Sequence, residues 1–235
     1  MNSATTRQWP VIARPGVGLV LVSEANVGTV QRQHAFAEAF RSSWEGEEWP
    51  RGLTSVTLFA ATDGYTVLTY AQWEDEDSYR VFARHILPGR RERIAAAVPG
   101  VQPTPAIAYR LYRERHWENG PEPECLVVVK VEFDSPDADR QTRWVNAVFG
   151  ALEGEPELPA GGLSGYFHLS RDGKHVLNYA EWTSEQAHRQ AIESSGQGTI
   201  GKGERWLAVR NFPGVVASGF QRYRLLASHS KEERA

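Results

Sequence analysis

The sequence of 235 residues has little cysteine, no long apolar run and no marked excess of one charge. Its single cysteine, Cys125, cannot form an internal disulfide, and it precedes a run of valine where a small buried side chain fits. The apolar runs are far shorter than the roughly 20 residues of a membrane-spanning helix. Residues 1–16 lack the basic-then-apolar order of a signal peptide. We therefore expect a soluble, cytoplasmic protein with no membrane partner.

Charge and motif patterns argue against further classes of function. The net charge is only −3, and the 26 basic residues are interleaved with acidic ones, so no nucleic-acid partner is expected. No spacing of Cys and His suits zinc, and no Ser/His/Asp grouping is recognisable. Residues 196–201 spell a dinucleotide fingerprint, but they follow a predicted helix and not a strand, which argues against a nucleotide site. We interpret this Gly-rich segment as a mobile lid over a pocket.

A ten-residue stretch occurs twice, at Gly64–Trp73 and Gly173–Trp182, with six identical positions and an Asp before each copy. Asp-Gly before a run of Val, Leu, Tyr and Trp is typical of a hairpin turn that leads into a strand, because Gly accepts the positive φ of such turns. Matching landmarks recur in the same order elsewhere, as in Tyr109-Arg-Leu and Tyr223-Arg-Leu. The chain is therefore interpreted as a tandem duplication.

The apolar spacing predicts the same order of elements in both repeats. In the first repeat we expect strands at 17–23, 53–60, 66–73 and 106–113, and helices at 29–45, 75–85 and 90–97. In the second repeat we expect strands at 126–133, 165–170, 175–182 and 215–227, and helices at 137–153 and 185–194. The predicted domains are a first unit at 15–113, a linker rich in Glu, Gly and Pro at 114–124, and a second unit at 125–228.

Each repeat has the order βαββαβ, which predicts an α+β, ferredoxin-like unit with two helices on one face of a four-stranded antiparallel sheet. The strand at 126–133 has large apolar residues on both faces, so the second face of the sheet should be covered as well. We predict that the two sheets pack face to face as an intrachain dimeric α+β barrel. A homodimer of such pseudo-dimeric chains is a further arrangement that this architecture allows.

Asn178 and Trp182 lie four residues apart and share one face of the third strand in the second repeat. An Asn four residues before a Trp that ends this strand, in a βαββαβ unit, resembles the antibiotic biosynthesis monooxygenase family of dimeric α+β barrels. The resemblance covers nearly the whole chain, twice over. It implies an oxygenase of secondary metabolism that oxidises an anthrone- or hydroquinone-like ring of a polycyclic aromatic polyketide with O2. It implies no metal and no bound cofactor.

Alternatives of the same fold stay open, because a fold hosts several functions. One variant is oxidative ring cleavage, with reduced flavin as an external electron donor. Others are a polyketide cyclase and a non-catalytic binding or assembly protein. Haem-degrading relatives have a His about ten residues after the Trp, where this chain has Ala83 and Ile192, which argues against haem.

The resemblance places the Asn and the Trp in a cavity between the sheet and the helices. The first repeat keeps Trp73 but has Thr69 in place of the Asn. Six residues beyond the Trp, where related anthrone oxygenases can have a Tyr, the two repeats have Tyr79 and His188. We therefore expect one working pocket in the second repeat and a degenerate pocket in the first.

The implied chemistry needs a dry, flat slot, a hydrogen-bond donor where negative charge gathers, and a base. The amide of Asn178 and the indole N–H of Trp182 are candidate donors. Each such contact lowers the activation free energy by roughly 3 kcal/mol. His168 and His188 are candidate bases, although histidines of this kind are more often structural. A Trp at a strand end is also common in cores. The remaining candidates, for substrate contact, are Trp144, Tyr79, Trp73 and Arg210.

Overall fold

The computed structural model describes residues 8–117, 120–155, 159–196 and 198–231, and it divides into two compact units. Unit 1 consists of Met1–Tyr109 and Tyr223–Ala235, and unit 2 consists of Arg110–Arg222. No helix in the described part of the chain is long and apolar enough to cross a membrane. Residues 118 and 119 of the predicted linker lie outside the described residues.

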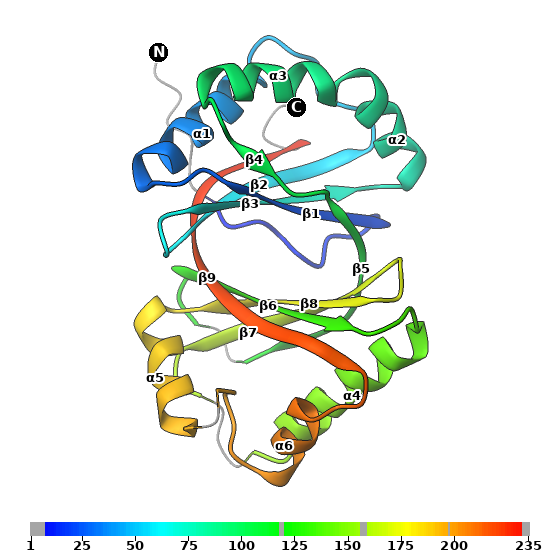
Figure 1. Ribbon diagram of the computed structural model, residues 1–235, viewed down its shortest axis with the longest axis vertical. Coiled ribbons are helices and arrows are strands. Elements are labelled where there is room, and N and C mark those ends of the chain that lie inside the picture. Colours follow the sequence, from blue (N-terminus) through cyan, green and yellow to red (C-terminus); the bar gives the residue numbers. More distant parts are fainter. Residues whose placement is uncertain (1–7, 118–119, 156–158, 197, 232–235) are drawn as a thin grey trace. The chain divides into compact units, whose positions relative to one another are not determined.

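Unit 1 has helices on one face of an antiparallel sheet (Figure 1). Strand β3 lies at its centre and pairs antiparallel with both β1 and β2. Helices α1, α2 and α3 cover the same face of this sheet (Figure 1). Its elements are β1 (Leu19–Asn26), α1 (Val30–Ser42), β2 (Leu53–Ala61), β3 (Thr66–Trp73), α2 (Glu76–His85), α3 (Leu87–Ala97), β4 (Gln102–Pro103) and the start of β5 (Ile107–His116).

Unit 2 repeats this plan. Strand β8 lies at its centre and pairs antiparallel with β6 and β7. The helices α4, α5 and α6 again lie on one face of the sheet (Figure 1). Its elements are β6 (Cys125–Phe133), α4 (Ala138–Glu153), β7 (Gly162–Ser170), β8 (His175–Trp182), α5 (Glu185–Ser195), α6 (Glu204–Arg210) and the first half of β9 (Val215–Ser230).

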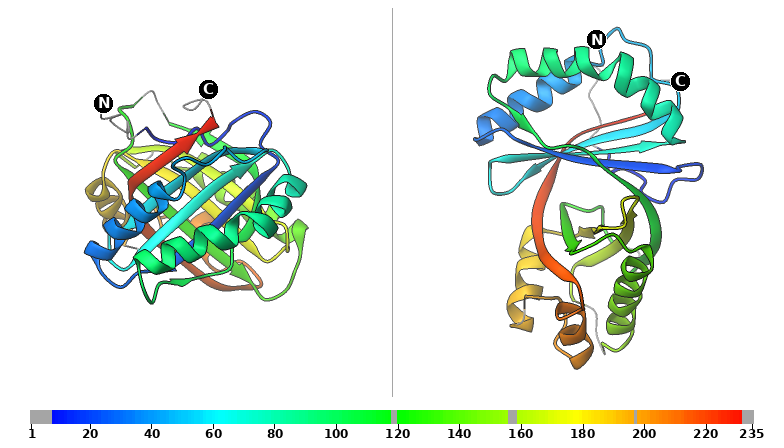
Figure 2. Two further views of the ribbon diagram at one scale, coloured as in Figure 1. Left: turned by 90° about the horizontal axis from the view of Figure 1, so that it is seen from above. Right: turned by 45° about the vertical axis from the view of Figure 1, so that its right-hand side comes forward.

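Two long strands, β5 and β9, belong to both units (Figure 2). Strand β5 begins beside β1, where Tyr109 pairs with Val20, and its remaining residues belong to unit 2 beside β7. Strand β9 lies beside β6 in unit 2, and from Tyr223 onward it pairs with β2 in unit 1. The last strand of each repeat therefore adds an edge strand to the sheet of the other unit.

The predicted α+β class is confirmed, and the predicted strands and helices are found with ends that differ by a few residues. Both β5 and β9 run three residues further than predicted, because the apolar alternation fades before the strand ends. The sequence interpretation missed β4 and α6, which are short elements of two and seven residues. The face-to-face packing of the two sheets stays a prediction.

The two predicted Asp-Gly turns have the expected geometry. Gly64 and Gly173 have φ values of +85° and +74°, which favour glycine. Asp63 Oδ1 accepts a hydrogen bond from the backbone N–H of Tyr65 at 2.7 Å, and Asp172 Oδ1 accepts one from Lys174 at 2.8 Å. These side chains stabilise the turn by bonding to their own backbone two residues on. The turns thus fix the register of both hairpins.

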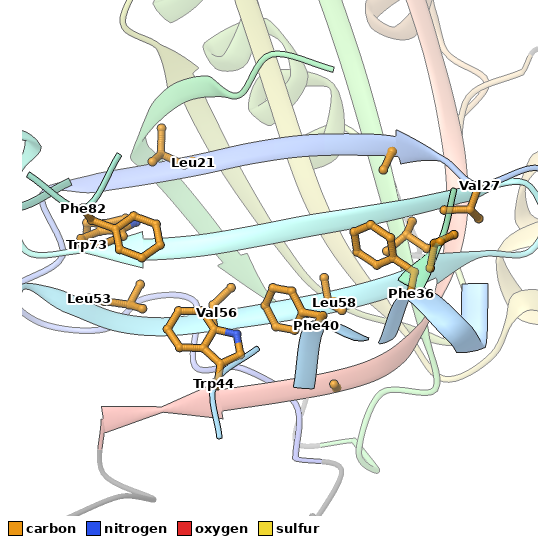
Figure 3. Close-up of a cluster of buried hydrophobic side chains, with 14 of the residues drawn as sticks. Leu21, Val27, Phe36, Phe40, Trp44, Leu53, Val56, Leu58, Trp73 and Phe82 are labelled. Carbon is orange, nitrogen blue, oxygen red and sulfur yellow. The ribbon is translucent and has the colours of Figure 1, made fainter. Parts of the chain in front are cut away.

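An apolar layer fills the space between sheet and helices in unit 1 (Figure 3). Phe36 and Phe40 project from α1 onto the sheet, and Trp73 projects from the end of β3. The opposite face of the sheet has polar side chains among its apolar ones. There Ser55 Oγ donates to Gln72 Oε1 at 2.6 Å, and both residues are buried. Each sheet therefore carries its Trp on the face turned to the helices.

Candidate active site

A cavity of about 400 Å³ lies between the sheet and the helices of unit 2. Its walls are mostly apolar and aromatic, with a few polar groups, as is usual for small-molecule sites. Five of the eight predicted site residues line it, namely Asn178, Trp182, His188, Trp144 and Arg210. The other three lie elsewhere. Trp73 and Tyr79 line a cavity of unit 1, and His168 lies on the opposite face of the unit 2 sheet.

Strand β8 places Asn178, Ala180 and Trp182 on the cavity face because successive side chains alternate between faces. Across the hairpin, Gly162 pairs with Trp182 and Gly165 pairs with Ala180. A Cβ atom at Gly165 would lie 3.4 Å from Asn178 Oδ1, so a larger residue there would fill space beside the amide. The two glycines of β7 thus leave room in front of β8.

The helices that carry the other cavity residues begin at capping side chains. Asp137 accepts the backbone N–H of Arg140 at 2.9 Å and starts α4, which places Trp144 over the sheet. Ser184 accepts the backbone N–H of Ala187 at 3.0 Å and starts α5. His188 follows in the first turn of α5, directly above Trp182, with 4.8 Å between their ring centroids.

Three polar atoms of the cavity residues are buried and make no hydrogen bond within the described ranges. They are Asn178 Oδ1 and the indole Nε1 atoms of Trp117 and Trp206. A buried polar atom without a partner costs about 1–3 kcal/mol, so native proteins rarely keep one without a water or ligand to bind it. One acceptor and two donors of the cavity residues are therefore left without a partner among the described residues.

His188 is held by its neighbours as a neutral ring. Arg222 Nε donates a hydrogen bond to His188 Nδ1 at 3.0 Å, and Phe220 contacts the ring edge with 5.0 Å between centroids. Burial lowers the pKa of His188 to about 3, with the cationic Arg222 and Arg189 lowering it further. Its Nδ1 is already an acceptor for Arg222, so this geometry does not support the predicted role of a general base.

His168 does not reach the cavity. It pairs with Leu177 in the β7–β8 hairpin, while its neighbour Phe167 pairs with Asn178 and lines the cavity. The His168 side chain is fully buried, its Nδ1 lies 3.0 Å from the Tyr166 carbonyl oxygen, and burial lowers its pKa to about 4. The predicted base role is therefore corrected to a structural one, because the side-chain alternation of the strand turns His168 away.

Several cavity residues were missed from the sequence. Trp117 lies in the predicted linker just after β5, and Trp206 lies on the missed helix α6. The spacing of Trp206, Val209 and Arg210 is helical and signals this short element. The Gly-rich segment packs against it, since a Cβ at Gly201 would lie 1.9 Å from Trp206 Nε1.

Part of this segment lines the cavity, at Gly198, Thr199 and Ile200. Gln197, inside the predicted lid, lies outside the described residues. A role of the segment as a lid stays a prediction.

A second cavity, of about 260 Å³, occupies the corresponding place in unit 1. Thr69, Trp73 and Tyr79 line it, and the rings of Trp73 and Tyr79 meet edge to face at 5.5 Å. Arg90 lies in its wall, almost fully buried, with its guanidinium 3.6 Å above the ring of Trp44. Arg90 Nη1 donates to the Ser43 carbonyl oxygen at 2.6 Å, at the end of α1.

Groups of three or more His, Cys, Asp or Glu side chains that could hold a metal ion do not occur among the described residues. The cavity of unit 2 instead combines aromatic walls, an amide, a neutral imidazole and the cation of Arg210. Groups of this kind are chemically suited to an aromatic molecule that carries oxygen substituents.

Comparison with known proteins relates part of the chain to a monooxygenase. No family model matches the sequence. Tetracenomycin F1 monooxygenase of Streptomyces glaucescens is 36% identical over 69 residues, which are 29% of this chain and 60% of that protein. Over this segment the chain is homologous to that monooxygenase. The resemblance predicted from Asn178 and Trp182 is thereby confirmed, although the match spans only about 60% of the length of this curated relative.

Solved structures share the fold of this chain over nearly its whole length. An anthrone oxidase-like protein aligns with 92% of this chain and 94% of its own, at a TM-score of 0.68 and 17% identity. A candidate monooxygenase from Fusobacterium nucleatum aligns with 93% of this chain and 96% of its own, at a TM-score of 0.56 and 12% identity. At these identities the likeness concerns the fold.

Proposed function

We propose that the protein is an oxygenase of aromatic polyketide metabolism, which oxidises an anthrone- or hydroquinone-like ring to a quinone in the cavity of unit 2. The observation that carries this proposal is the aromatic cavity in which Asn178 and Trp182 meet, in a chain homologous to a tetracenomycin F1 monooxygenase. Trp144 and Trp182 provide flat walls for a polycyclic ring. The reaction needs no metal and no bound cofactor in this proposal.

The proposed reaction begins with loss of a proton from the substrate, which makes the ring electron-rich. The resulting anion passes one electron to O2, and the carbon radical and superoxide combine to form a C–O bond. The hydroperoxide then loses water, so that an anthrone and O2 give an anthraquinone and water. The protein contributes by stabilising the anion, since a donor that strengthens as charge develops contributes roughly 3 kcal/mol.

The residues of the cavity fit these tasks. The amide NH2 of Asn178 and the indole N–H of Trp182 are the proposed donors to the substrate oxygen. Arg210, at the end of α6, adds positive charge to the cavity wall. The largely apolar walls lower the local dielectric, which strengthens these contacts. Neither His188 nor His168 is a proton acceptor in this site, so the substrate proton passes to water.

The proposal is tested with 1,8-dihydroxyanthrone as the substrate, in an oxygen electrode and by the absorbance of the anthraquinone product. Rates are corrected for uncatalysed autoxidation. We expect one O2 consumed per anthraquinone formed, with no gain on adding reduced flavin. Turnover of the anthrone that persists without O2 would contradict the oxygenase assignment and favour a cyclase. If the protein increases neither the rate of anthraquinone formation nor O2 uptake above autoxidation, the result would favour a non-catalytic binding protein.

A matched pair of variants locates the reaction. Asn178→Ala in unit 2 should lower kcat at least tenfold, because it removes a donor to the developing charge. Thr69→Ala occupies the equivalent position of unit 1 and should leave kcat unchanged. Both variants are checked by thermal unfolding, since a loss that followed from destabilisation would not count. An unaltered rate in Asn178→Ala would remove this residue from the site.

A further inference from the structure

The strand β9 brings a charged side chain against the site from outside the β8–α5 region. Arg222 lies near the end of the unit 2 part of β9, and its Nε donates to His188 Nδ1 at 3.0 Å. Phe220, two residues earlier on the same strand, contacts the His188 ring and also lines the cavity. The imidazole is thus fixed between Trp182, Phe220 and Arg222.

This contact decides which nitrogen of His188 carries the proton. A guanidinium group only donates hydrogen bonds, so Nδ1 must present its lone pair to Arg222. The pKa of about 3 keeps the ring neutral, and a neutral imidazole has one proton. That proton therefore resides on Nε2. His188 lines the cavity, so it meets an occupant as a donor.

The other charged groups near this pair leave that assignment unchanged. Arg189 follows His188 on α5, and its Nη2 is ion-paired with Glu185 at 2.7 Å. Burial, followed by the charge of Arg189, lowers the pKa of Arg222, and Glu185, Cys125 on β6 and Glu193 oppose this shift only in part. No described carboxylate is hydrogen-bonded to His188 in place of Arg222.

We propose that Arg222 is a positioning residue that fixes His188 as an Nε2–H donor, and that this donor binds a negatively charged or carbonyl oxygen of a planar phenolic ligand. This inference rests on the proposed function for the class of ligand. It assigns to His188 the stabilisation of a substrate anion instead of proton abstraction. The Nε2–H of His188 then joins the amide of Asn178 on the polar side of the ligand.

The residues of the first repeat at the positions equivalent to His188 and Arg222 support this assignment. The match of Tyr109 with Tyr223 makes Ala108 the counterpart of Arg222, and Tyr79 is the counterpart of His188. A tyrosine hydroxyl is a donor in any environment near neutral pH, so it needs no arginine to set a tautomer. A histidine at that position does need one, and the two residues differ together between the repeats.

The tautomer is tested first, by long-range 1H–15N NMR of the full-length protein labelled on histidine. We expect the Nε2–H form for His188, with no protonation between pH 8 and pH 5. In Arg222→Leu the pKa of His188 should rise, because a cationic neighbour is lost, and both tautomers should appear. A His188 that carries its proton on Nδ1 in the wild-type protein would overturn the proposal.

Binding is tested second, with 1,8-dihydroxyanthraquinone as the probe and tryptophan fluorescence quenching as the signal. Arg222→Leu and His188→Phe should each raise the Kd about tenfold. Arg189→Leu removes a nearby charge but no hydrogen bond to His188, and it should leave the Kd unchanged. The double variant His188→Tyr with Arg222→Ala reproduces the pair of unit 1 and should restore the Kd to within threefold. Wild-type affinity in Arg222→Leu would overturn the proposal.

These measurements also separate this inference from the proposed function. Because neither measurement uses turnover, the donor role of His188 stands if both succeed while no O2 is consumed. In that case the reaction assignment alone fails. Conversely, O2-dependent turnover that is unaffected in Arg222→Leu removes Arg222 from the site and leaves the oxygenase assignment intact.

Discussion

The two units build their cavities from matching elements, yet the cavities differ in size and in polar groups. Both are bounded by the helix face of a β-hairpin that ends in a Trp, but the unit 2 cavity measures about 400 Å³ and the unit 1 cavity about 260 Å³. Where β7 has Gly162 and Gly165, β2 has Leu53 and Val56 in the same register. Two units with matching elements therefore differ in how much space the residues beside the central strand leave free.

This difference shows that more than the exchange of Asn178 for Thr69 separates the two sites. The glycines of β7 create the space, Asn178 and His188 supply the polar contacts, and Arg222 fixes the imidazole. Unit 1 lacks each of these features. It has a buried arginine, Arg90, packed over Trp44 instead.

The opposite faces of the two sheets also differ. The buried pair of Ser55 with Gln72 in unit 1 corresponds to the buried pair of Ser164 with Glu181 in unit 2. Burial raises the pKa of Glu181. It is also the main cause that raises the pKa of the neighbouring Tyr166 to about 12. Unit 2 thus keeps more titratable groups in its interior, which makes its stability more dependent on pH.

The strongest way to break the comparison is to give unit 2 the fuller cavity of unit 1. Gly165→Val places a side chain where even a Cβ would lie 3.4 Å from Asn178 Oδ1 and 3.5 Å from Trp117 Cη2. We expect at least a hundredfold loss of kcat/KM, or about 2.7 kcal/mol, since the substrate ring no longer fits. Thermal unfolding should show no loss of stability, because valine is favoured in strands.

The matched control is Val56→Ala at the equivalent position of unit 1. It should lower the free energy of unfolding by roughly 1–2 kcal/mol through the lost burial. Its effect on kcat/KM should be less than twofold. Wild-type turnover in Gly165→Val would show that the space created by the β7 glycines does not separate the two units.

Acid unfolding tests whether a buried titratable residue on the sheet face turned away from the helices, His168, makes the stability of unit 2 depend on pH. The folded protein keeps His168 neutral down to about pH 4, whereas the unfolded chain protonates it near pH 6.5. The unfolded state binds more protons between these values, so stability falls as the pH falls from about 6.5 to about 4. At pH 5 this histidine should cost roughly 2 kcal/mol of unfolding free energy relative to pH 8.

The measurement is urea unfolding at pH 8 and pH 5 for the wild type and for His168→Phe. This variant introduces the residue type that unit 1 has at the equivalent position, Phe59. The variant should show a pH difference about 2 kcal/mol smaller than that of the wild type. His188, with a folded pKa of about 3, should keep its own contribution in both proteins. An equal pH difference in the two proteins would contradict the neutral state of His168.

The smallest effect is expected from the reverse exchange in unit 1. Thr69→Asn supplies the amide of Asn178, but Leu53 and Val56 still fill the space in front of it. We expect Thr69→Asn to leave kcat within twofold of its parent protein, both in the wild type and in the slower Asn178→Ala variant, as measured by O2 uptake. Recovery of turnover in that background would show that the amide alone distinguishes an active unit from a degenerate one.

Much of the fold was predictable from the sequence, because hairpins and amphipathic helices leave local periodic patterns. The repeated Asp-Gly turns predicted the hairpins, and the apolar spacing predicted α4 to within one residue and α1 to within three. The helix α6 was missed because seven residues between glycines and Asn211 carry too short a pattern. The last three residues of β5 were assigned to the linker, because their charged and polar side chains give no apolar alternation.

The site was predictable only in part. Asn178 and Trp182 lie on one strand, and His188 lies in the first turn of the helix that follows it. Local geometry alone therefore places the three side chains together in the cavity. His168 was a candidate base by its residue type alone, and the sequence left its face of the sheet open. Its pairing with Leu177 places it on the face opposite Asn178. Trp117, which lines the cavity, and Arg222, which hydrogen-bonds to His188, were missed because pairings between strands distant in sequence bring them to the site.

The sequence by itself determined the duplication, the α+β elements and the Asn-Trp motif, since these depend on residues within about ten positions of one another. Only the tertiary structure decided the properties that make the two units different. The volume of each cavity depends on which residues of β2 or β7 face β3 or β8. The proton position on His188 depends on Arg222, which lies 34 residues away and meets it only through the sheet. Cavity volume and tautomer are set by contacts, and contacts between distant residues exist only once the chain has folded.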